Sequence, residues 1–257
     1  MNEILTSRQN PLVVKTALLK DKKYRQREKV FLAEGTTLLS EALLSGVSPQ
    51  RVFATPQAIG RLPQLPQKTR LVPVAEPVLE KLTTEDASDG VVSVFDFLPP
   101  RPARAKGILI LESLQDPGNV GTVVRTAAAL GVGQVWLYNC ADLYNPKTVR
   151  ATMGALFRQS LRVIDDLPEA LEELKSQGVS VFAAACDPQS KPLDDTALPE
   201  HCAVMIGNEG HGLSARALEM CDRSLTIPMT DMESLNAALA AGIFMWEMTR
   251  KARREKA

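Results

Sequence analysis

The sequence has few of the residues that several classes of binding site require. Of its 257 residues, two are histidine and four are cysteine. The cysteines, Cys140, Cys186, Cys202 and Cys221, are widely spaced and form no C-x-x-C pair, which argues against a zinc site. Each lies in or beside an apolar stretch, so we expect buried, reduced thiols and no metal.

Other absences exclude further classes of protein. Aromatic residues make up 5% of the chain, which gives no support to an aromatic platform for stacking single-stranded RNA. No apolar run approaches the roughly 18 residues of a membrane span, and the N-terminal residues lack the apolar core of a signal peptide, so we expect a cytoplasmic protein. Neither the dinucleotide pattern G-x-G-x-x-G nor the P-loop pattern follows a strand, which disfavours a nicotinamide-dependent enzyme.

Charge is balanced overall but unevenly distributed along the chain. Residues 1–29 contain eight basic against three acidic side chains, a net charge of +5, and a second basic group lies between Arg250 and Lys256. Such groups attract the phosphates of nucleic acids, although a solvated helix face and a frayed tail are an equally weighted alternative for either group alone. The basic residues of the first group are Arg8, Lys15, Lys20, Lys22, Lys23, Arg25, Arg27 and Lys29.

The proline-rich and basic stretch LPPRPARAKG, residues 98–107, predicts a semi-rigid linker. We therefore expect a small α/β domain over residues 1–98, a linker over 99–106 and a second domain over 107–257. In the second domain apolar strands alternate with helices, which favours a parallel sheet with ligands beyond the carboxyl ends of its strands. The expected strands cover 107–114, 134–139, 179–186, 202–207 and 224–229, and the expected helices cover 119–131, 167–178 and 234–253.

Three polar loops follow strands of this predicted sheet, at residues 115–125, 207–212 and 228–236. In the first, Asn119 is expected to cap a helix, and Arg125, nearly two turns later, to lie on roughly the same helix face and reach a phosphate or carboxylate. In the second, Gly207 and Gly210 are expected to allow close backbone approach, and Glu209 offers a carboxylate. One such loop alone is an ordinary turn, but three in one domain predict a binding site.

The three loops together resemble the signature motifs of the SpoU (TrmH-type) RNA 2'-O-ribose methyltransferases of the SPOUT superfamily. The matching segments are DPGNVGTVVRTAAALG at 116–131, IGNEGHGLS at 206–214 and IPMTDMESLNAALAAG at 227–242, in the family's order and spacing. The N-terminal stretches at 6–15 and 31–43 are similar to that family's ribosomal-protein-like substrate-binding domain. One position departs from the common pattern, because the S-L-N-V-S of many members ends here in Ala238.

The resemblance implies a trefoil-knotted α/β methyltransferase domain, S-adenosylmethionine as cofactor, RNA as partner and a homodimer formed by C-terminal domains. It places the polar active-site positions at Asn119, Arg125, Glu209, Ser234 and Asn236. The implied cofactor site is formed by Gly207, Asn208, Glu209, Ile227, Leu235 and Asn236. For RNA contacts the basic residues Arg8, Lys15, Lys22, Lys23, Arg25 and Arg125 are the candidates.

The implied reaction is attack of a ribose 2'-oxygen on an activated methyl group, so positioning should dominate catalysis. A guanidinium normally stays protonated, so Arg125 is expected to act as an electrostatic clamp, and Glu209 is the more conventional proton acceptor, with cofactor or Arg125 binding as its alternative role. His211 is expected to be incidental. The two-domain layout favours 23S ribosomal RNA as substrate. Transfer RNA and a catalytically silent RNA-binding protein of ribosome assembly are the alternatives.

Overall fold

The computed structural model describes residues 4–84, 89–103, 105–187, 189–231 and 234–250. The chain forms two compact units. Unit 1 comprises Met1–Pro99 and Asp142–Phe157, and unit 2 comprises Pro100–Ala141 and Arg158–Ala257. The chain therefore passes between the units three times. The proline-rich linker predicted the first passage, whereas nothing in the sequence predicted that sixteen residues of the second half pack with the first.

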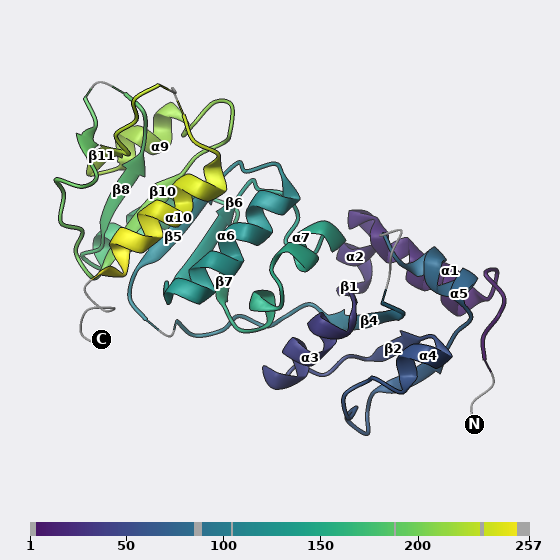
Figure 1. Ribbon diagram of the computed structural model, residues 1–257. Helices are drawn as coiled ribbons and strands as arrows, with labels where there is room; N and C mark the ends of the chain where they lie inside the picture. Colours follow the sequence, from purple (N-terminus) through teal and green to yellow (C-terminus); the bar gives the residue numbers. More distant parts are fainter. Residues whose placement is uncertain (1–3, 85–88, 104, 188, 232–233, 251–257) are drawn as a thin grey trace. The chain divides into compact units, whose positions relative to one another are not determined.

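Unit 1 is built on a four-stranded sheet of order β1-β4-β2-β3, in which β2 and β3 are parallel and the other pairs antiparallel (Figure 1). Side chains alternate between the faces of each strand. Leu32 and Val94 pack with α1 and α5 on one face. The elements are α1 (Pro11–Ala17), η1 (Leu18–Lys20), α2 (Lys22–Glu28), β1 (Val30–Glu34), α3 (Thr36–Leu44), β2 (Arg51–Ala54), α4 (Pro56–Ile59), β3 (Arg70–Pro73), α5 (Glu76–Leu82), β4 (Val91–Asp96), α7 (Pro146–Ala151) and η2 (Ala155–Phe157).

The segment Asp142–Phe157 joins unit 1 through aromatic packing. Phe31 of β1 has its ring centroid 4.7 Å from that of Tyr144, and Phe95 of β4 lies 5.0 Å from Phe157. Tyr144 also stacks on Phe97 at 4.0 Å. Tyr144 and Phe157 come from opposite ends of the segment, so the whole segment contributes to the apolar core of unit 1.

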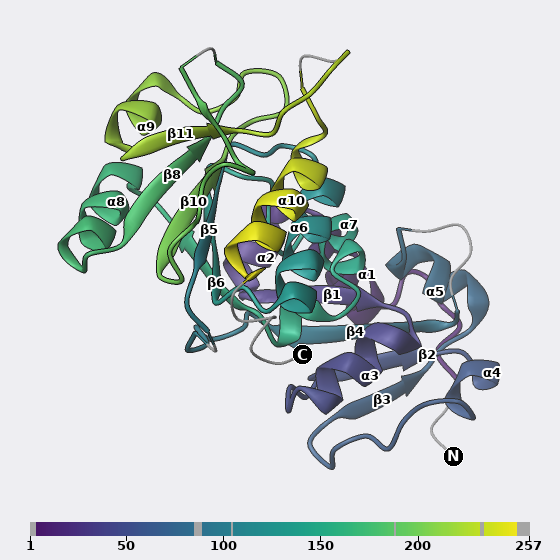
Figure 2. The ribbon, with the colours of Figure 1, turned by 60° about the vertical axis from the view of Figure 1, so that its left-hand side comes forward.

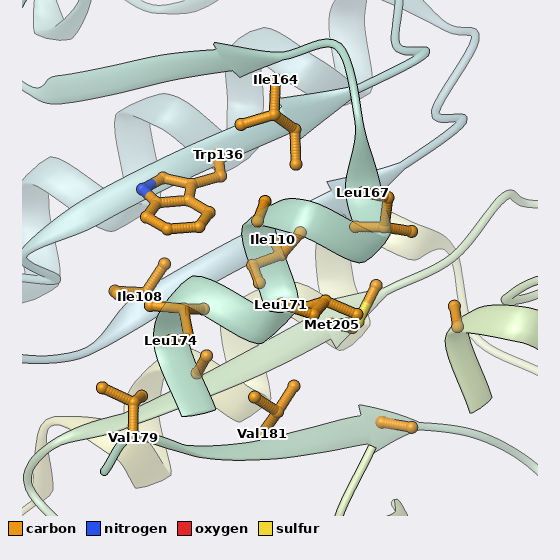
Figure 3. Packing of buried hydrophobic residues seen from close by; sticks show 14 of the residues in the cluster. Ile108, Ile110, Trp136, Ile164, Leu167, Leu171, Leu174, Val179, Val181 and Met205 are labelled. Atoms are coloured by element: carbon orange, nitrogen blue, oxygen red, sulfur yellow. The ribbon is translucent and has the colours of Figure 1, made fainter. Parts of the chain in front are cut away.

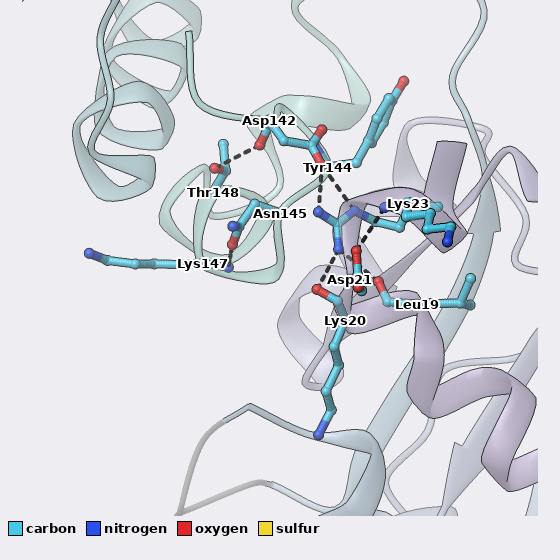
Figure 4. A network of polar contacts seen from close by, with 10 residues as sticks. Leu19, Lys20, Asp21, Lys23, Asp142, Tyr144, Asn145, Lys147 and Thr148 are labelled. Carbon is cyan, nitrogen blue, oxygen red and sulfur yellow. Dashed lines mark hydrogen bonds and ion pairs between the residues drawn. The ribbon is translucent and has the colours of Figure 1, made fainter. Parts of the chain in front are cut away.

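The basic N-terminal stretch is not one continuous helix, and one of its cations is structural. Asp21 caps α2 by accepting from the backbone N–H of Lys23, which separates α2 from α1 and η1. Arg25 was predicted to contact RNA, and this prediction is wrong because its side chain is 2% exposed. Its guanidinium donates to Asp142 Oδ2 from Nε at 3.0 Å and from Nη2 at 2.5 Å (Figure 4). An ion pair buried in this way cannot face a phosphate.

Unit 2 contains a seven-stranded sheet of order β7-β6-β5-β10-β8-β11-β9, in which every pairing is parallel, as the alternation of strands and helices predicted. Its elements are β5 (Ile108–Glu112), α6 (Pro117–Leu130), β6 (Gln134–Tyr138), β7 (Ser160–Ile164), α8 (Leu167–Ser176), β8 (Ser180–Ala184), β9 (Lys191–Pro192), β10 (Cys202–Ile206), α9 (Ala215–Met220), β11 (Arg223–Thr226) and α10 (Ala237–Met248). The sequence did not predict α7, β7, β9 or α9.

Helices cover both faces of this sheet. Figure 2 shows α8 and α9 on one side of β10 and β8, and α6 and α10 on the other. The central strands β5 and β10 are covered on both faces and are buried at every position. Trp136, Leu171 and Met205 meet in the core beneath α8 (Figure 3). This packing holds the carboxyl ends of the central strands at one edge.

The last helix, α10, starts at Ala237, three residues later than predicted, and runs to Met248. Residues 251–253 of the predicted helix lie outside the described residues. Of the C-terminal basic group, Lys251, Arg253, Arg254 and Lys256 lie outside the described residues, as do Met232 and Glu233 of the third polar loop. In the described part of the chain no helix is long and apolar enough to cross a membrane.

Candidate active site

The three polar loops gather at the carboxyl ends of β5, β10 and β11. In a parallel sheet these ends share one edge, which is where ligands bind in open α/β folds. Two helix caps fix the loops. Asp116 accepts from the backbone N–H of Asn119 at 2.8 Å at the start of α6, and Asn236 accepts from Ala238 and Leu239 at the start of α10. The expectation that Asn119 caps the first helix is wrong, since Asp116 does so and leaves the Asn119 side chain available.

Gly207 is required by close backbone approach. A Cβ atom at this position would lie 2.2 Å from the carbonyl carbon of Gly212 and 2.3 Å from the nitrogen of Leu213. The loop after β10 folds back on itself here, because the backbone N–H of Asn208 donates to Gly212 O and that of Gly212 donates to Asn208 O, both at 2.9 Å. By contrast, a Cβ at Gly210 would meet only Asn208 Oδ1, at 3.6 Å.

Asn208 fastens this loop to the neighbouring strand. Its Nδ2 donates to the carbonyl of Ser113, after β5, at 2.8 Å. Its Oδ1 accepts from the backbone N–H groups of Gly210 at 2.9 Å and His211 at 3.2 Å. The same Ser113 carbonyl accepts from Gln115 Nε2 at 3.1 Å. The sequence does not single out Ser113, because a backbone acceptor leaves no signal in the residue pattern.

A chain of hydrogen bonds joins one side chain from each loop. Asn236 Nδ2 donates to Asn119 Oδ1 at 3.3 Å, and Asn119 Nδ2 donates to Glu209 Oε1 at 2.9 Å. Glu209 Oε2 accepts from Asn208 Nδ2 at 3.3 Å. Both carboxylate oxygens therefore receive a hydrogen bond from an amide, which fixes the orientation of the carboxylate at the rim of the cavity. The structure thus brings together Asn119, Glu209 and Asn236 as the sequence predicted.

Beside these residues lies a cavity of about 660 Å³. This volume is in the range of small-molecule sites. Among the described residues that line it, the only charged side chains are Asp187 and Glu209, both acidic. The Ser190 hydroxyl, and then the Gln189 N–H, hold the pKa of Asp187 below its usual value by donating to its carboxylate. Other lining residues include Ala184, Ala185, Cys186, Ile206, Gly207, Asn208, His211, Leu225, Ile227, Met229, Ser234, Leu235 and Phe244.

The loop after β8 is a second contribution that sequence reasoning missed. Ala185, Cys186 and Asp187 follow a strand of the same sheet and line the cavity. The rule that ligands bind beyond the carboxyl ends of strands would have found this loop, although it contains no glycine. Cys202 is buried, Cys140 and Cys221 are partly buried, and Cys186 is exposed. The expectation that all four thiols are buried is therefore wrong for Cys186 and holds fully only for Cys202.

Arg125 stands apart from the hydrogen-bonded chain. Its side chain is exposed, and it lines neither this cavity nor the hollow beside α10 that Asn119, Thr122 and Thr126 line. The expectation that Arg125 shares a face with Asn119 is therefore wrong. Six helical residues correspond to about 600° of rotation, so the two side chains leave α6 about 120° apart.

The basic candidates of unit 1 divide into exposed and buried residues. Arg8, Lys15, Lys22 and Lys23 are exposed, unlike Arg25. Lys15 forms an ion pair with Glu28 at 3.1 Å. Within the described residues there is no group of three histidine, cysteine, aspartate or glutamate side chains placed to hold a metal ion.

The sequence profile of the family described as the SpoU rRNA methylase family matches residues 106–246. This range contains all three loops and the cavity. The chain belongs to the SpoU rRNA methylase family. A second profile, described as the MRM3-like substrate binding domain, matches residues 10–93 of unit 1.

Relatives of this SpoU family member cover almost its whole length. An uncharacterized tRNA/rRNA methyltransferase of Synechocystis is 35% identical, with 96% of this chain and 93% of the relative covered. The 23S rRNA (guanosine(2553)-2'-O)-methyltransferase RlmP of Bacillus subtilis is 32% identical, with 95% of this chain and 98% of the relative covered. The crystal structure of an AdoMet-bound rRNA methyltransferase from Sinorhizobium meliloti superimposes with a TM-score of 0.83 at 27% identity, over 97% of this chain and 98% of that chain.

Proposed function

We propose that this SpoU family enzyme transfers a methyl group from S-adenosylmethionine to a ribose 2'-hydroxyl of 23S ribosomal RNA. The observation that carries the proposal is the hydrogen-bonded chain Asn236–Asn119–Glu209 at the rim of a cavity shaped by Gly207. The Bacillus subtilis relative, named for 2'-O-methylation of 23S rRNA, supports the choice of substrate.

The residues of the cavity fit S-adenosylmethionine in size, shape and charge. Gly207 leaves no room for a side chain, so a ligand meets bare backbone there. Ile227 and Leu235 supply apolar walls, and Asn208, Glu209 and Ser234 supply polar groups. Asn236, also expected to bind the cofactor, lines the hollow beside α10 and reaches this cavity only through its bond to Asn119. The acidic lining suits a ligand that carries a sulfonium and an ammonium group. When bound, the cofactor supplies a methyl group already activated by positive sulfur.

Glu209 is the residue best placed to accept the proton of the ribose 2'-hydroxyl. Asn119 and Asn208 hold its two oxygens, and each oxygen retains a lone pair for a further hydrogen bond. Asn119 is oriented in turn by Asn236, which also starts α10. Ser234, two residues before Asn236, lines the cavity. Its hydroxyl serves as an additional donor to the bound ligands. The fixed orientation of these groups contributes to the rate by positioning.

Arg125 acts as a clamp on phosphate and on developing negative charge. A guanidinium remains protonated, so it stabilises an anion and does not accept the proton. Within the described residues Arg125 makes no ion pair with Glu209, which leaves Glu209 to its contacts with the two asparagines. The exposed position of Arg125 on α6 allows it to meet the backbone of a large substrate.

Unit 1 binds the RNA. Its exposed cations Arg8, Lys15, Lys22 and Lys23 contact phosphates, and such contacts give affinity without choosing the nucleotide. The match of residues 10–93 to a substrate-binding domain supports this division. We place the functional domains at residues 1–98 and 107–257, joined by the linker 99–106, with the difference that Asp142–Phe157 of the second domain packs in unit 1.

The active form is a homodimer that packs through α10. Apart from Glu247, this helix consists of apolar residues, yet its outer side is exposed at Leu239 (63%), Ile243 (39%) and Trp246 (53%). A helix of this composition is stable when every side is covered. These three residues line a hollow of about 510 Å³ that also includes Asn119 and Asn236. A second copy covering this surface would lie beside the active site.

Membership of the family supports two further proposals. The chain segment that carries the second and third loops forms a trefoil knot, and the cofactor binds within it. An enzyme of bacterial ribosomal RNA works in the cytoplasm, where we expect this one.

Transfer of labelled methyl from S-adenosylmethionine to total RNA from cells that lack the gene tests the proposal. Label in 23S RNA after size separation is the expected result. Label in transfer RNA would support the proposed methyl transfer but overturn the choice of 23S RNA as substrate. Absence of label from every RNA, despite tight cofactor binding, would favour a silent RNA-binding protein, a role that intact Asn119, Glu209 and Asn236 argue against.

A further inference from the structure

The exposed side of α2 carries an unfavourable arrangement of cations. Relative to buried Arg25, the side chains of Lys23 and Arg27 point to the opposite side of the helix, one turn apart. Like charges at this spacing destabilise a helix, and Lys22 and Lys23 occupy its first turn, where the helix dipole disfavours cations. Lys22 and Lys23 have no ion-pair partner among the described residues. Arg27 pairs with Glu28 at 3.0 Å and lies over the ring of Tyr24. The helix therefore presents a ridge, Lys23 and Arg27, in which the unpaired Lys23 ammonium is the group that an anionic chain would stabilise most.

The same helix is anchored on its inner side by Arg25. Besides the two bonds to Asp142, the guanidinium donates from Nη1 to the carbonyls of Leu19 at 2.8 Å and Lys20 at 2.7 Å (Figure 4). Asp142 is held from its own side, because Oδ1 accepts from Tyr144 N at 3.0 Å and its carbonyl accepts from Thr148 Oγ1 at 3.1 Å. The turn before α2 is thus fastened to the start of the segment Asp142–Phe157.

Asp142 follows directly on a stretch of chain that is bonded to the active-site loops. Within unit 2, the backbone N–H of Ala141 donates to Leu114 O at 2.7 Å. Gln115 Nε2 donates to Asn139 O at 2.8 Å as well as to Ser113 O. The carbonyl of Ser113 also accepts the hydrogen bond from Asn208. Asp116, the residue after Gln115, caps the helix that carries Asn119. Asp142, the partner of Arg25, therefore lies three residues after Asn139, whose carbonyl accepts from Gln115 beside the supports of Asn208.

We propose that Arg25 and Asp142 are positioning residues that couple RNA held on the Lys23–Arg27 ridge to the arrangement of the active-site loops. This inference rests on the proposed function. Displacing Asp142 shifts Asn139–Ala141, which changes the supports of Asn208 and Asn119. The ridge itself governs RNA affinity, whereas the anchor governs turnover, so the two sets of residues affect different kinetic constants.

Steady-state methyl transfer to ribosomal RNA from cells lacking the gene separates these effects. Active sites are counted by calorimetric titration with S-adenosylhomocysteine, and kcat is calculated per cofactor-binding site, so that misfolded enzyme does not lower its value. For Asp142→Asn we expect kcat per active site to fall about tenfold or more, as misplacement of reacting groups does, with a smaller change in KM. Lys23→Ala/Arg27→Ala should instead raise KM with little change in kcat, and should weaken the salt dependence of KM.

Asp96→Asn is the matched control, since it removes an exposed carboxylate from the same unit that bonds only to Gln50 among the described residues. It should behave as the wild type. If Asp142→Asn does not fold, Asp142→Glu keeps the charge, displaces the segment by one methylene and is expected to lower kcat in the same direction. Wild-type kcat per active site in a folded Asp142 variant would overturn the coupling. Failure of the wild-type enzyme to methylate any RNA would instead overturn the proposed function.

Discussion

Asn119 Nδ2 donates a hydrogen bond of 2.9 Å to Glu209 Oε1, across ninety residues of sequence. This contact joins the loop after β5 to the loop after β10, and Asn236 extends it to the start of α10. Neither residue is buried, so the contact contributes little to stability and its value lies in orienting the carboxylate.

Replacing Asn119 by alanine should therefore impair turnover while sparing the cofactor site. We expect kcat to fall about 10- to 100-fold, the usual effect of losing a group that orients an active-site ligand. Thr122→Ala, one turn along the same helix, is the control and should stay near wild type. An Asn119→Ala enzyme with normal kcat would show that Glu209 does not need this support.

Arg125→Ala should remove turnover and leave the affinity for S-adenosylmethionine within a few-fold. The reason is that Arg125 lies outside the cavity and acts on the substrate. We expect a loss of about 10²- to 10³-fold in kcat, the range for removing one charge-stabilising donor. Calorimetric titration with cofactor checks the assignment, and loss of cofactor binding in this variant would contradict it.

Gly207→Ala should abolish cofactor binding, because the new methyl group would collide with the backbone of Gly212 and Leu213. Backbone atoms cannot move aside as a flexible side chain can, so the loop itself must shift. Gly210→Ala adds the same methyl group to the same loop, only in ordinary contact with Asn208. Thermal-shift and calorimetric titrations with S-adenosylhomocysteine should show loss of binding in the first variant and near-normal binding in the second.

The thiols should differ sharply in reactivity. Burial raises the pKa of Cys140 and Cys202 to about 11, and that of Cys221 to about 12. Since the thiolate is the reactive form, these three remain protonated and slow to alkylate at about pH 8. Cys186 is exposed and lines the cavity. We expect mass spectrometry to find it alkylated first, and S-adenosylhomocysteine to slow its labelling. Fast labelling of Cys140 in the native protein would contradict the burial described here.

Leu239→Glu should convert the proposed dimer to monomers, because the charge would lie on the apolar outer side of α10. Leu44→Glu is the matched control, since Leu44 on α3 is 83% exposed and lies in unit 1. Sedimentation velocity distinguishes the outcomes. If the Leu239→Glu variant remained dimeric, the dimer interface would not include the outer side of α10.

The sequence predicted most strands of the second unit and the three loops, because apolar strands and helix caps are local patterns. It did not predict the role of Arg25, which has the same basic surroundings as exposed Lys22 and Lys23 and differs only in facing Asp142 from far along the chain. The placement of Asp142–Phe157 in unit 1 was missed for a similar reason, since Tyr144 and Phe157 find their partners only in the folded sheet. By contrast, the spacing of six residues already shows from helix geometry that the side chains of Arg125 and Asn119 leave α6 on different faces.

The position at which the methyl group is attached tests the proposed function most directly. Ribosomal RNA methylated by the purified enzyme would be digested to nucleosides and analysed by mass spectrometry, with Glu209→Gln analysed in parallel. The account predicts one nucleotide in 23S RNA that carries the methyl group on its ribose and resists alkaline cleavage, and a signal strongly reduced in the Glu209→Gln enzyme. A methyl group on a base, or full ribose methylation without the Glu209 carboxylate, would contradict it.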